Sequence, residues 1–219
     1  MLDVDGSPNV GLYAYATDDY CLIGRGLADE VMDGFKKAFD VPLIEFTLGG
    51  SQQVGAYLNG NSKKLLVPSL ITEHEIEILK ENNIEFEIIE TIHTALGNDL
   101  IIGETYFFYM PEMEKETVDK IKSILGIDGE SLSLKNWDVV GSIAIISSKG
   151  GLIQKDVPED VIEKLGSKLG VEFEVGTVNF GSHVLGGGLV VNAQGMVIGS
   201  ASAGIEVTNA DLAFGFLEK

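Results

Sequence analysis

The sequence predicts a mixed α/β (α+β) fold in which five quasi-equivalent β-β-α-β repeats form a closed, pseudo-fivefold propeller. Three observations lead to this prediction. A glycine preceded by Val or Leu recurs at nearly constant spacing, each predicted helix ends at a constant distance from that glycine, and the two chain ends together complete one repeat. Sequence periods of roughly 20 to 50 residues are typical of repeat architectures.

The recurring glycine ends a six-residue motif that we call the box. The boxes span residues 6–11, 50–55, 92–97, 136–141 and 181–186. Their final glycines are separated by 44, 42, 44 and 45 residues. Glycine at such a point permits either a close approach of strands near an axis or a sharp turn between units, and the sequence leaves both interpretations open.

The first part of each repeat is predicted to be a hairpin. In the first repeat, the apolar stretches 12–16 and 20–23 flank the polar turn 17–19. Polar turns at nearly the same distance from the box glycine recur at residues 59–61, 148–150 and 192–194. Apolar runs separated by a short polar turn are typical of paired antiparallel strands.

A helix and a third strand are predicted to complete each repeat. Apolar residues at helical spacing, such as Ile162, Leu165 and Leu169, indicate one buried helix face. Thr72 and Glu75 are spaced as in a capping box at a helix start. The helices are predicted to end at residue types that tolerate a left-handed backbone, 28 or 29 positions after the preceding box glycine: Asp40, Asn83, Gly126, Gly170 and Gly215.

The chain ends predict that the ring closes. The 33 residues after Gly186 and the first 11 residues add up to 44, which is one full period. We therefore expect residues 2–4 to pair into the fifth unit, whereas an open array would need polar capping repeats at both ends. The expected domain is 1–219, with repeats at 11–54, 55–96, 97–140, 141–185 and 186–219, the last completed by residues 1–10.

Composition narrows the possible functions. With 15 Lys+Arg against 34 Asp+Glu the net charge is −19, which argues against a protein that wraps DNA or RNA, and acidic stretches such as residues 73–87 are expected to be solvated. The one cysteine excludes an internal disulfide, and we expect no metal and no cofactor. No signal peptide and no membrane span is recognisable, so we expect a cytoplasmic protein with no membrane partner.

Several short segments resemble one known family. They are Asn-Val-Gly-Leu-Tyr-Ala-Tyr at 9–15, Leu-Leu-Val-Pro at 65–68, Ala-Leu-Gly-Asn at 95–98, Gly-Gly-Leu at 150–152, Gly-Thr-Val-Asn at 176–179 and Gly-Leu-Val-Val-Asn at 188–192. Their order and spacing are similar to those of the translation initiation factor 6 family. The resemblance covers residues 9–216, and the absence of a C-terminal extension is typical of the archaeal branch.

The resemblance implies a fold called the pentein and a function that the repeat pattern does not reveal. Members of this family bind the large ribosomal subunit at its intersubunit face and prevent joining with the small subunit. They act in translation initiation and large-subunit maturation by occupying space, without catalysis. Their main contact is a large-subunit protein near the sarcin-ricin loop of the ribosomal RNA. We expect this chain to act in the same way, as a monomer.

The resemblance also implies where the ribosome contact lies. The family uses inter-unit loops at one end of the ring, and the Ala-Leu-Gly-Asn segment matches a motif implicated there. The expected contact residues are this motif and its pseudo-symmetric equivalents: Leu96, Gly97, Asn98, Val10, Gly11, Val54 and Gly55.

Two alternatives are kept. Penteins also include guanidine-modifying enzymes, which need a nucleophilic Cys, a His and carboxylates. Cys21 is the one thiol and is expected to be buried in a strand, while His93 and His183 lie two ring units apart, where we expect them to be loop hydrogen-bonding residues. The second alternative is a ring that binds some other protein partner.

Overall fold

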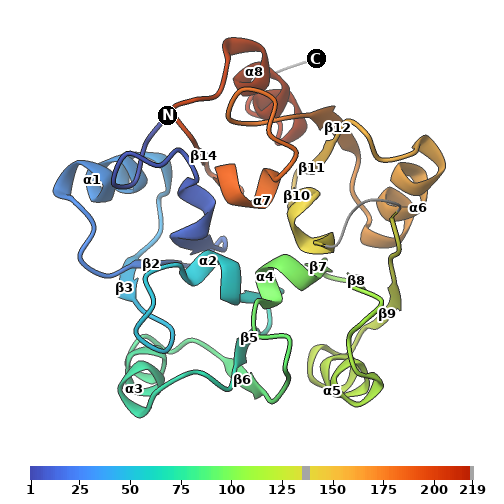
Figure 1. Ribbon diagram of the computed structural model, residues 1–219. Coiled ribbons are helices and arrows are strands. Elements are labelled where there is room, and N and C mark those ends of the chain that lie inside the picture. The colour runs from blue at the N-terminus through green and yellow to red at the C-terminus, as the bar shows by residue number, and fades with distance from the viewer. Residues whose placement is uncertain (135–138, 218–219) are drawn as a thin grey trace.

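The computed structural model describes residues 1–134 and 139–217 of the chain. These residues form five similar units around a central axis, with short helices inside and longer helices outside (Figure 1). Part of the fourth box, residues 136–138, lies outside the described residues. The predicted mixed α/β ring of β-β-α-β units is confirmed.

Each unit is built on one small sheet. The first two strands pair antiparallel as a hairpin, and the third pairs parallel with the second. Unit by unit, the strands are β1 (Ala14–Ala16), β2 (Cys21–Gly24) and β3 (Leu43–Phe46); β4 (Asn59–Gly60), β5 (Leu65–Pro68) and β6 (Phe86–Ile89); β7 (Leu100–Ile102), β8 (Tyr106–Tyr109) and β9 (Asp128–Ser131); β10 (Ala144–Ser147), β11 (Gly150–Gln154) and β12 (Phe173–Gly176); and β13 (Leu189–Val191) and β14 (Met196–Ile198).

The N-terminus supplies the third strand position of the fifth unit. Leu2 forms a parallel bridge with Gly199. Its N–H donates to the carbonyl of Ile198 at 3.0 Å, and the N–H of Ser200 donates to the Leu2 carbonyl at 2.9 Å. The sheet edge at β14 is thereby covered, as the arithmetic of the chain ends predicts.

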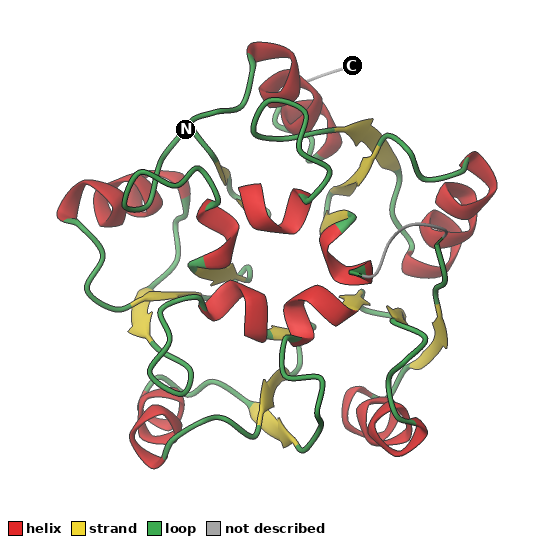
Figure 2. Cartoon of the chain, viewed as in Figure 1, coloured by secondary structure: helices red, strands yellow, loops and turns green. Residues whose placement is uncertain are grey.

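One longer helix per unit lies on the outside of the ring: α1 (Asp29–Ala38), α3 (Glu73–Glu81), α5 (Lys115–Leu125), α6 (Glu159–Leu169) and α8 (Gly204–Ala213) (Figure 2). Four of the five predicted helix ends have a left-handed backbone, with φ of 55° at Asn83, 68° at Gly126, 73° at Gly170 and 68° at Gly215. The prediction is wrong for Asp40. There α1 ends at Ala38 and the chain continues in extended conformation at Phe39.

Five short inner helices surround the axis: η1 (Val10–Leu12), α2 (Val54–Tyr57), α4 (Leu96–Asp99), η2 (Val140–Ser142) and α7 (Leu185–Gly188) (Figure 1). Each includes a box glycine and contacts the next inner helix, and the series closes where α7 meets η1. Sequence analysis missed them because elements of three or four residues are too short to show helical periodicity.

The core is divided among the seams between units. On β2, Cys21 and Ile23 pack with α1 of their own unit, whereas Leu22 packs with β5 and α3 of the next unit. The other core clusters likewise combine successive units. Each unit thus depends on its neighbours to bury both faces of its sheet, which is the energetic reason for a ring.

Candidate functional site

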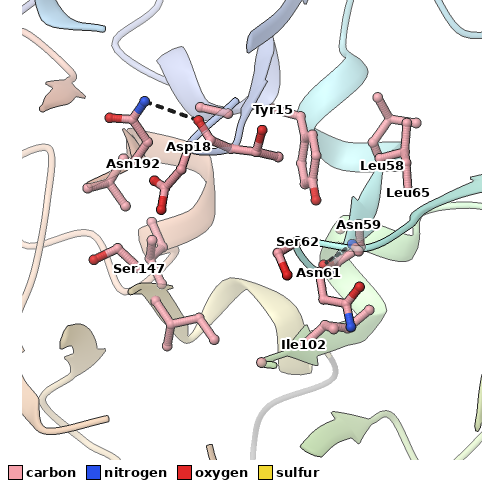
Figure 3. Close-up of a pocket in the computed structure, with 18 of the residues that line it drawn as sticks. Tyr15, Asp18, Leu58, Asn59, Asn61, Ser62, Leu65, Ile102, Ser147 and Asn192 are labelled. Atoms are coloured by element: carbon pink, nitrogen blue, oxygen red, sulfur yellow. Dashed lines mark hydrogen bonds between the residues drawn. The ribbon is translucent and has the colours of Figure 1, made fainter. Parts of the chain in front are cut away.

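The two ends of the ring axis differ. At one end, hairpin turns from all five units surround a cavity of about 860 Å³ (Figure 3). The box glycines line the inner end of this cavity, but the residues that precede them in each box do not. We call residues 6–10, 49–54, 91–96 and 179–185 the box loops. They lie at the opposite end of the axis, where they lead into the inner helices.

The structure brings the seven predicted contact residues together on the first three inner helices. The side chains of Val10, Val54 and Leu96 are 0% exposed, so they pack inside the ring and offer no surface to a partner. Gly11 is also buried. Three residues keep partial exposure: Gly55, Gly97 and Asn98.

The box glycines allow neighbouring inner helices to touch. A Cβ atom at Gly55 would collide with the carbonyl oxygen of Gly11, and one at Gly97 would collide with that of Gly55. The same relation links Gly141 to Gly97 and Gly11 to Gly186, which is the step that closes the ring. Close approach is therefore the correct interpretation of these glycines, and it involves both neighbouring inner helices and the first residues of adjacent strands, such as Ala14 beside Gly55 and Leu100 beside Gly141.

A network of polar contacts holds the third box loop, next to Asn98. The His93 backbone N–H donates to Thr91 Oγ1 at 3.0 Å, and His93 Nε2 lies 3.2 Å from the carbonyl oxygen of Glu112. The Nδ1 atom lies 4.0 Å from Asp99 Oδ2. Burial raises the pKa of the Asp99 carboxyl, and the His93 imidazole opposes this shift. His93 thus fixes a loop, as expected from the sequence.

A buried carboxylate holds the second box loop. Glu75 Oε1 accepts hydrogen bonds from Thr47 Oγ1 at 2.6 Å and from the Gly50 N–H at 3.1 Å, and its Oε2 accepts from the Gly49 N–H at 3.0 Å. It also completes the predicted capping box with Thr72. At 2% exposure Glu75 is an exception to the prediction that residues 73–87 are solvated.

Glu206 repeats this arrangement at the fifth box loop, which sequence analysis did not anticipate. The Glu206 side chain accepts hydrogen bonds from Thr177 Oγ1 at 2.6 Å and from the N–H groups of Phe180 and Gly181 at 3.0 and 2.8 Å. It also accepts from the N–H of Ala203 at 2.7 Å, at the start of α8. The signal available in the sequence was the Thr and Glu at matching positions of two repeats.

The four box loops contain no formally charged residue, although the exposed Asp5 directly precedes the first of them. Their 24 residues contain no Lys, Arg, Asp or Glu, although 22% of the chain is charged and about five such residues would be expected. Exposed groups there are amides and apolar side chains, among them Asn9, Gln52, Gln53, Ile92 and Phe180. A partner that contacts these loops alone desolvates no charged side chain of theirs.

The opposite end is tied together by polar hairpin turns. In several of these turns a side-chain oxygen accepts a hydrogen bond from the backbone N–H two residues later. The acceptors are the Oδ1 atoms of Asn192 and Asn61 and the hydroxyl oxygens of Thr17 and Ser147. Asp18 accepts from the Ala193 N–H at 2.7 Å and from Ser148 Oγ at 3.2 Å, which joins hairpins of three units. Figure 3 shows several of these side chains around the cavity.

The cavity lacks the thiol and imidazole groups on which a guanidine-modifying mechanism depends. Its lining includes neither Cys nor His. Burial raises the pKa of the Cys21 thiol to about 12, and that residue is 0% exposed. Among the described residues, no cluster of three His, Cys, Asp or Glu side chains could hold a metal ion. Within the same residues no helix is long and apolar enough to span a membrane.

Comparison with solved structures defines the class of this ring. It is similar to a dimethylarginine dimethylaminohydrolase variant in its adduct with S-methyl-L-thiocitrulline, with a TM-score of 0.53 and 14% identity, over 84% of this chain and 76% of that one. A likeness at this identity concerns the fold alone. The protein is a pentein.

Sequence comparison then identifies the family. The profile of the eIF-6 family matches residues 1–212. Relatives named translation initiation factor 6 are 30% identical in Thermococcus onnurineus, over 99% of this chain and 98% of the relative, and 31% identical in Sulfolobus acidocaldarius, over 97% of each. The relative in Pyrococcus abyssi is 30% identical over 99% of this chain and 98% of the relative. The chain belongs to the eIF-6 family.

Proposed function

We propose that this protein is a translation initiation factor that binds the large ribosomal subunit at its intersubunit face and prevents joining with the small subunit. It acts as a cytoplasmic monomer and takes part in large-subunit maturation. Membership in the eIF-6 family supports the ribosomal role. The observation that carries the mode of binding is the uncharged box-loop end on a chain of net charge −19.

The main partner is a large-subunit protein near the sarcin-ricin loop of the ribosomal RNA. Binding to nucleic acid relies on Lys and Arg that neutralise phosphates. The box loops contain neither, and the remaining surface is predominantly acidic. An uncharged end suits a protein surface, while the acidic remainder is repelled by RNA and favours a single docking orientation.

The contact extends from Asn98 and Gly97 across the neighbouring box loops. The buried residues Val10, Val54 and Leu96 support this surface from below, because their packing sets the positions of the inner helices. Such residues position the contact without touching the partner.

Sedimentation through sucrose gradients tests the proposal. The protein is expected to comigrate with purified large subunits and to reduce the yield of joined ribosomes when small subunits are added. Asn98→Ala should weaken comigration, whereas Gln194→Ala, an exposed residue at the hairpin end, should not. Failure of the unaltered protein to comigrate would contradict the proposal and favour a ring that serves another protein partner.

The enzymatic alternative has no support at the level of the site. A guanidine-modifying mechanism needs a thiolate beside a general base. Cys21 faces α1 in the core of the first unit, and the high pKa of its thiol keeps it protonated at neutral pH. We therefore propose a role without catalysis.

A further inference from the structure

The fifth box loop has an unusual backbone. Three successive residues, Asn179, Phe180 and Gly181, have positive φ angles of 48°, 62° and 91°. The left-handed region is readily available to glycine and tolerated by asparagine, but it is disfavoured for a bulky aromatic residue such as Phe180. The loop therefore holds Phe180 in a strained conformation.

Equivalent loops show that the fold itself does not require a bulky residue there. In the second box loop the left-handed positions are Gly49 and Gly50, with φ of 56° and 81°. At the start of the first box loop they are Asp5, which directly precedes the loop, and Gly6, with φ of 51° and 77°. In the second loop glycine meets the backbone requirement at both positions without strain, and in the first a small polar residue stands where Phe180 does, so the bulky side chain of Phe180 needs a separate explanation.

Surrounding contacts hold the strained conformation in place. Glu206 accepts hydrogen bonds from the N–H groups of Phe180 and Gly181. Ser202 Oγ accepts from the Asn179 N–H at 2.9 Å, and Asn179 Nδ2 donates to the Pro8 carbonyl at 2.9 Å, across the seam with the first unit. The loop, beside α8 in Figure 1, is thus fixed from three sides. Strain maintained in this way is typical of functional positions.

The Phe180 ring contributes little to the core. Phe180 is 86% exposed, so its apolar surface remains in water. Two other apolar side chains lie on the segments that Glu206 ties together: Val184 is 47% exposed and Ile205 is 68% exposed. An exposed aromatic side chain on a backbone that is fixed in advance is typical of the residues that dominate protein–protein binding energy.

We infer that Phe180 is an anchor residue that inserts its ring into an apolar pocket of a protein partner. The inference rests on the proposed function, in which that partner is a protein of the large ribosomal subunit. Stacking on an RNA base is disfavoured because no Lys or Arg occurs between residues 169 and 218 to neutralise a phosphate. Acidic partners and lipid headgroups are disfavoured for the same reason.

The variant Phe180→Gly tests the effect of the ring on binding separately from its effect on stability. Because glycine accepts the left-handed conformation, the urea midpoint of the variant should be equal to or higher than that of the unaltered protein. Its affinity for purified large subunits, measured by co-sedimentation titration, should fall roughly tenfold or more. Val175→Ala, an apolar residue of β12 that is 43% exposed, is the matched control and should leave the affinity unchanged.

Two further measurements make the outcome decisive. Phe180→Arg should also weaken binding if the site is an apolar pocket, whereas tighter binding would indicate RNA and overturn the inference. Sedimentation velocity of the free protein should show a monomer. A dimer that Phe180→Gly abolishes would assign the ring to self-association and also overturn it.

The inference and the proposed function fail in different ways. If the unaltered protein does not bind large subunits, the proposed function is wrong. If it binds and Phe180→Gly binds equally well, only the anchor role is wrong.

Discussion

At the scale of single residues, the ring depends on glycines, because the lack of a side chain allows adjacent units to come into contact. Gly11, Gly55, Gly97 and Gly141 each face a backbone carbonyl oxygen of the adjacent unit's inner helix. A backbone carbonyl cannot move aside as a flexible side chain can. Any Cβ atom there would therefore push two units apart, and the strain would be shared around the closed ring.

Replacing one box glycine should therefore destabilise the whole protein. Gly55→Ala places a Cβ atom against the carbonyl oxygens of Gly11 and Ala14, and we expect a loss of about 1 to 3 kcal/mol in the free energy of unfolding. Urea denaturation measures this. Gly204→Ala is the control, because a Cβ there meets nothing within 4 Å and alanine suits the start of α8, so its stability should be equal or slightly higher. Equal losses in both variants would contradict the steric explanation.

At the scale of elements, two buried carboxylates each connect the start of an outer helix to the box loop that precedes that helix in the sequence. Glu75 joins the start of α3 to the second box loop, and Glu206 joins the start of α8 to the fifth. Burial acts to raise the pKa of the Glu75 carboxyl, but hydrogen bonds from Thr47 and from three backbone N–H groups outweigh it, so the pKa lies below its ordinary value. The charged form of Glu75 therefore stabilises the fold.

Glu75→Gln should lower stability by about 2 kcal/mol near neutral pH, because an amide nitrogen replaces one of the two acceptor oxygens. A group whose pKa is lowered by folding stabilises the protein above its unfolded pKa, and this contribution is lost as pH falls through the folded value. The difference between the two proteins should therefore shrink below the ordinary pKa of 4.5. Chemical denaturation across this pH range measures it. Glu77→Gln, an exposed residue of the same helix, should differ from the unaltered protein by less than about 0.5 kcal/mol at every pH.

Elements with strong local signals were predictable from the sequence, and those set by contacts between units were not. The box glycines and the left-handed helix ends at Gly126 and Gly170 recur with the period, so they revealed the repeats and the closure. The inner helices carry too little sequence for a periodic signal. The left-handed backbone at Phe180 went unnoticed because residue type argues against it, and the burial of Glu75 depends on a loop that precedes it by 25 residues.

The candidate site was predictable only in part. The resemblance points to the motif that contains Asn98, and its contact role stays a prediction, but no pattern in the sequence distinguishes the buried apolar residues Val10, Val54 and Leu96 from exposed ones. Their burial follows from the packing of the inner helices against the strands around them. The shared lack of charged residues in the four box loops becomes apparent only when these segments, far apart in sequence, are compared in the fold.

At the scale of the whole molecule, the ring is completed by a few residues at the N-terminus. Leu2 fills the third strand position of the fifth sheet, and its side chain occupies the space beside Gly34 of α1. The hydrophobic core of the first unit includes Val190 and Val197 from the fifth. The seam between the two ends of the chain is thus built from the same kinds of contact as the other seams.

Removing residues 1–3 should weaken this seam selectively. The Ser200 N–H loses its acceptor on Leu2, so its hydrogen exchange should become faster by roughly tenfold or more. The Ser69 N–H is the internal control, since it occupies the equivalent position in the second unit and donates to Ile89 within that unit. Equal acceleration at both sites would indicate general destabilisation and contradict a local closing role.

The pairing of Leu2 with Gly199 also sets an order of events during synthesis. Leu2 waits for its partner during synthesis, because Gly199 is made almost two hundred residues later. Earlier units can pack on one another as they emerge, yet the first unit keeps one face of its core uncovered until the fifth arrives. The seam between the first and fifth units can therefore form only after the fifth unit has been made.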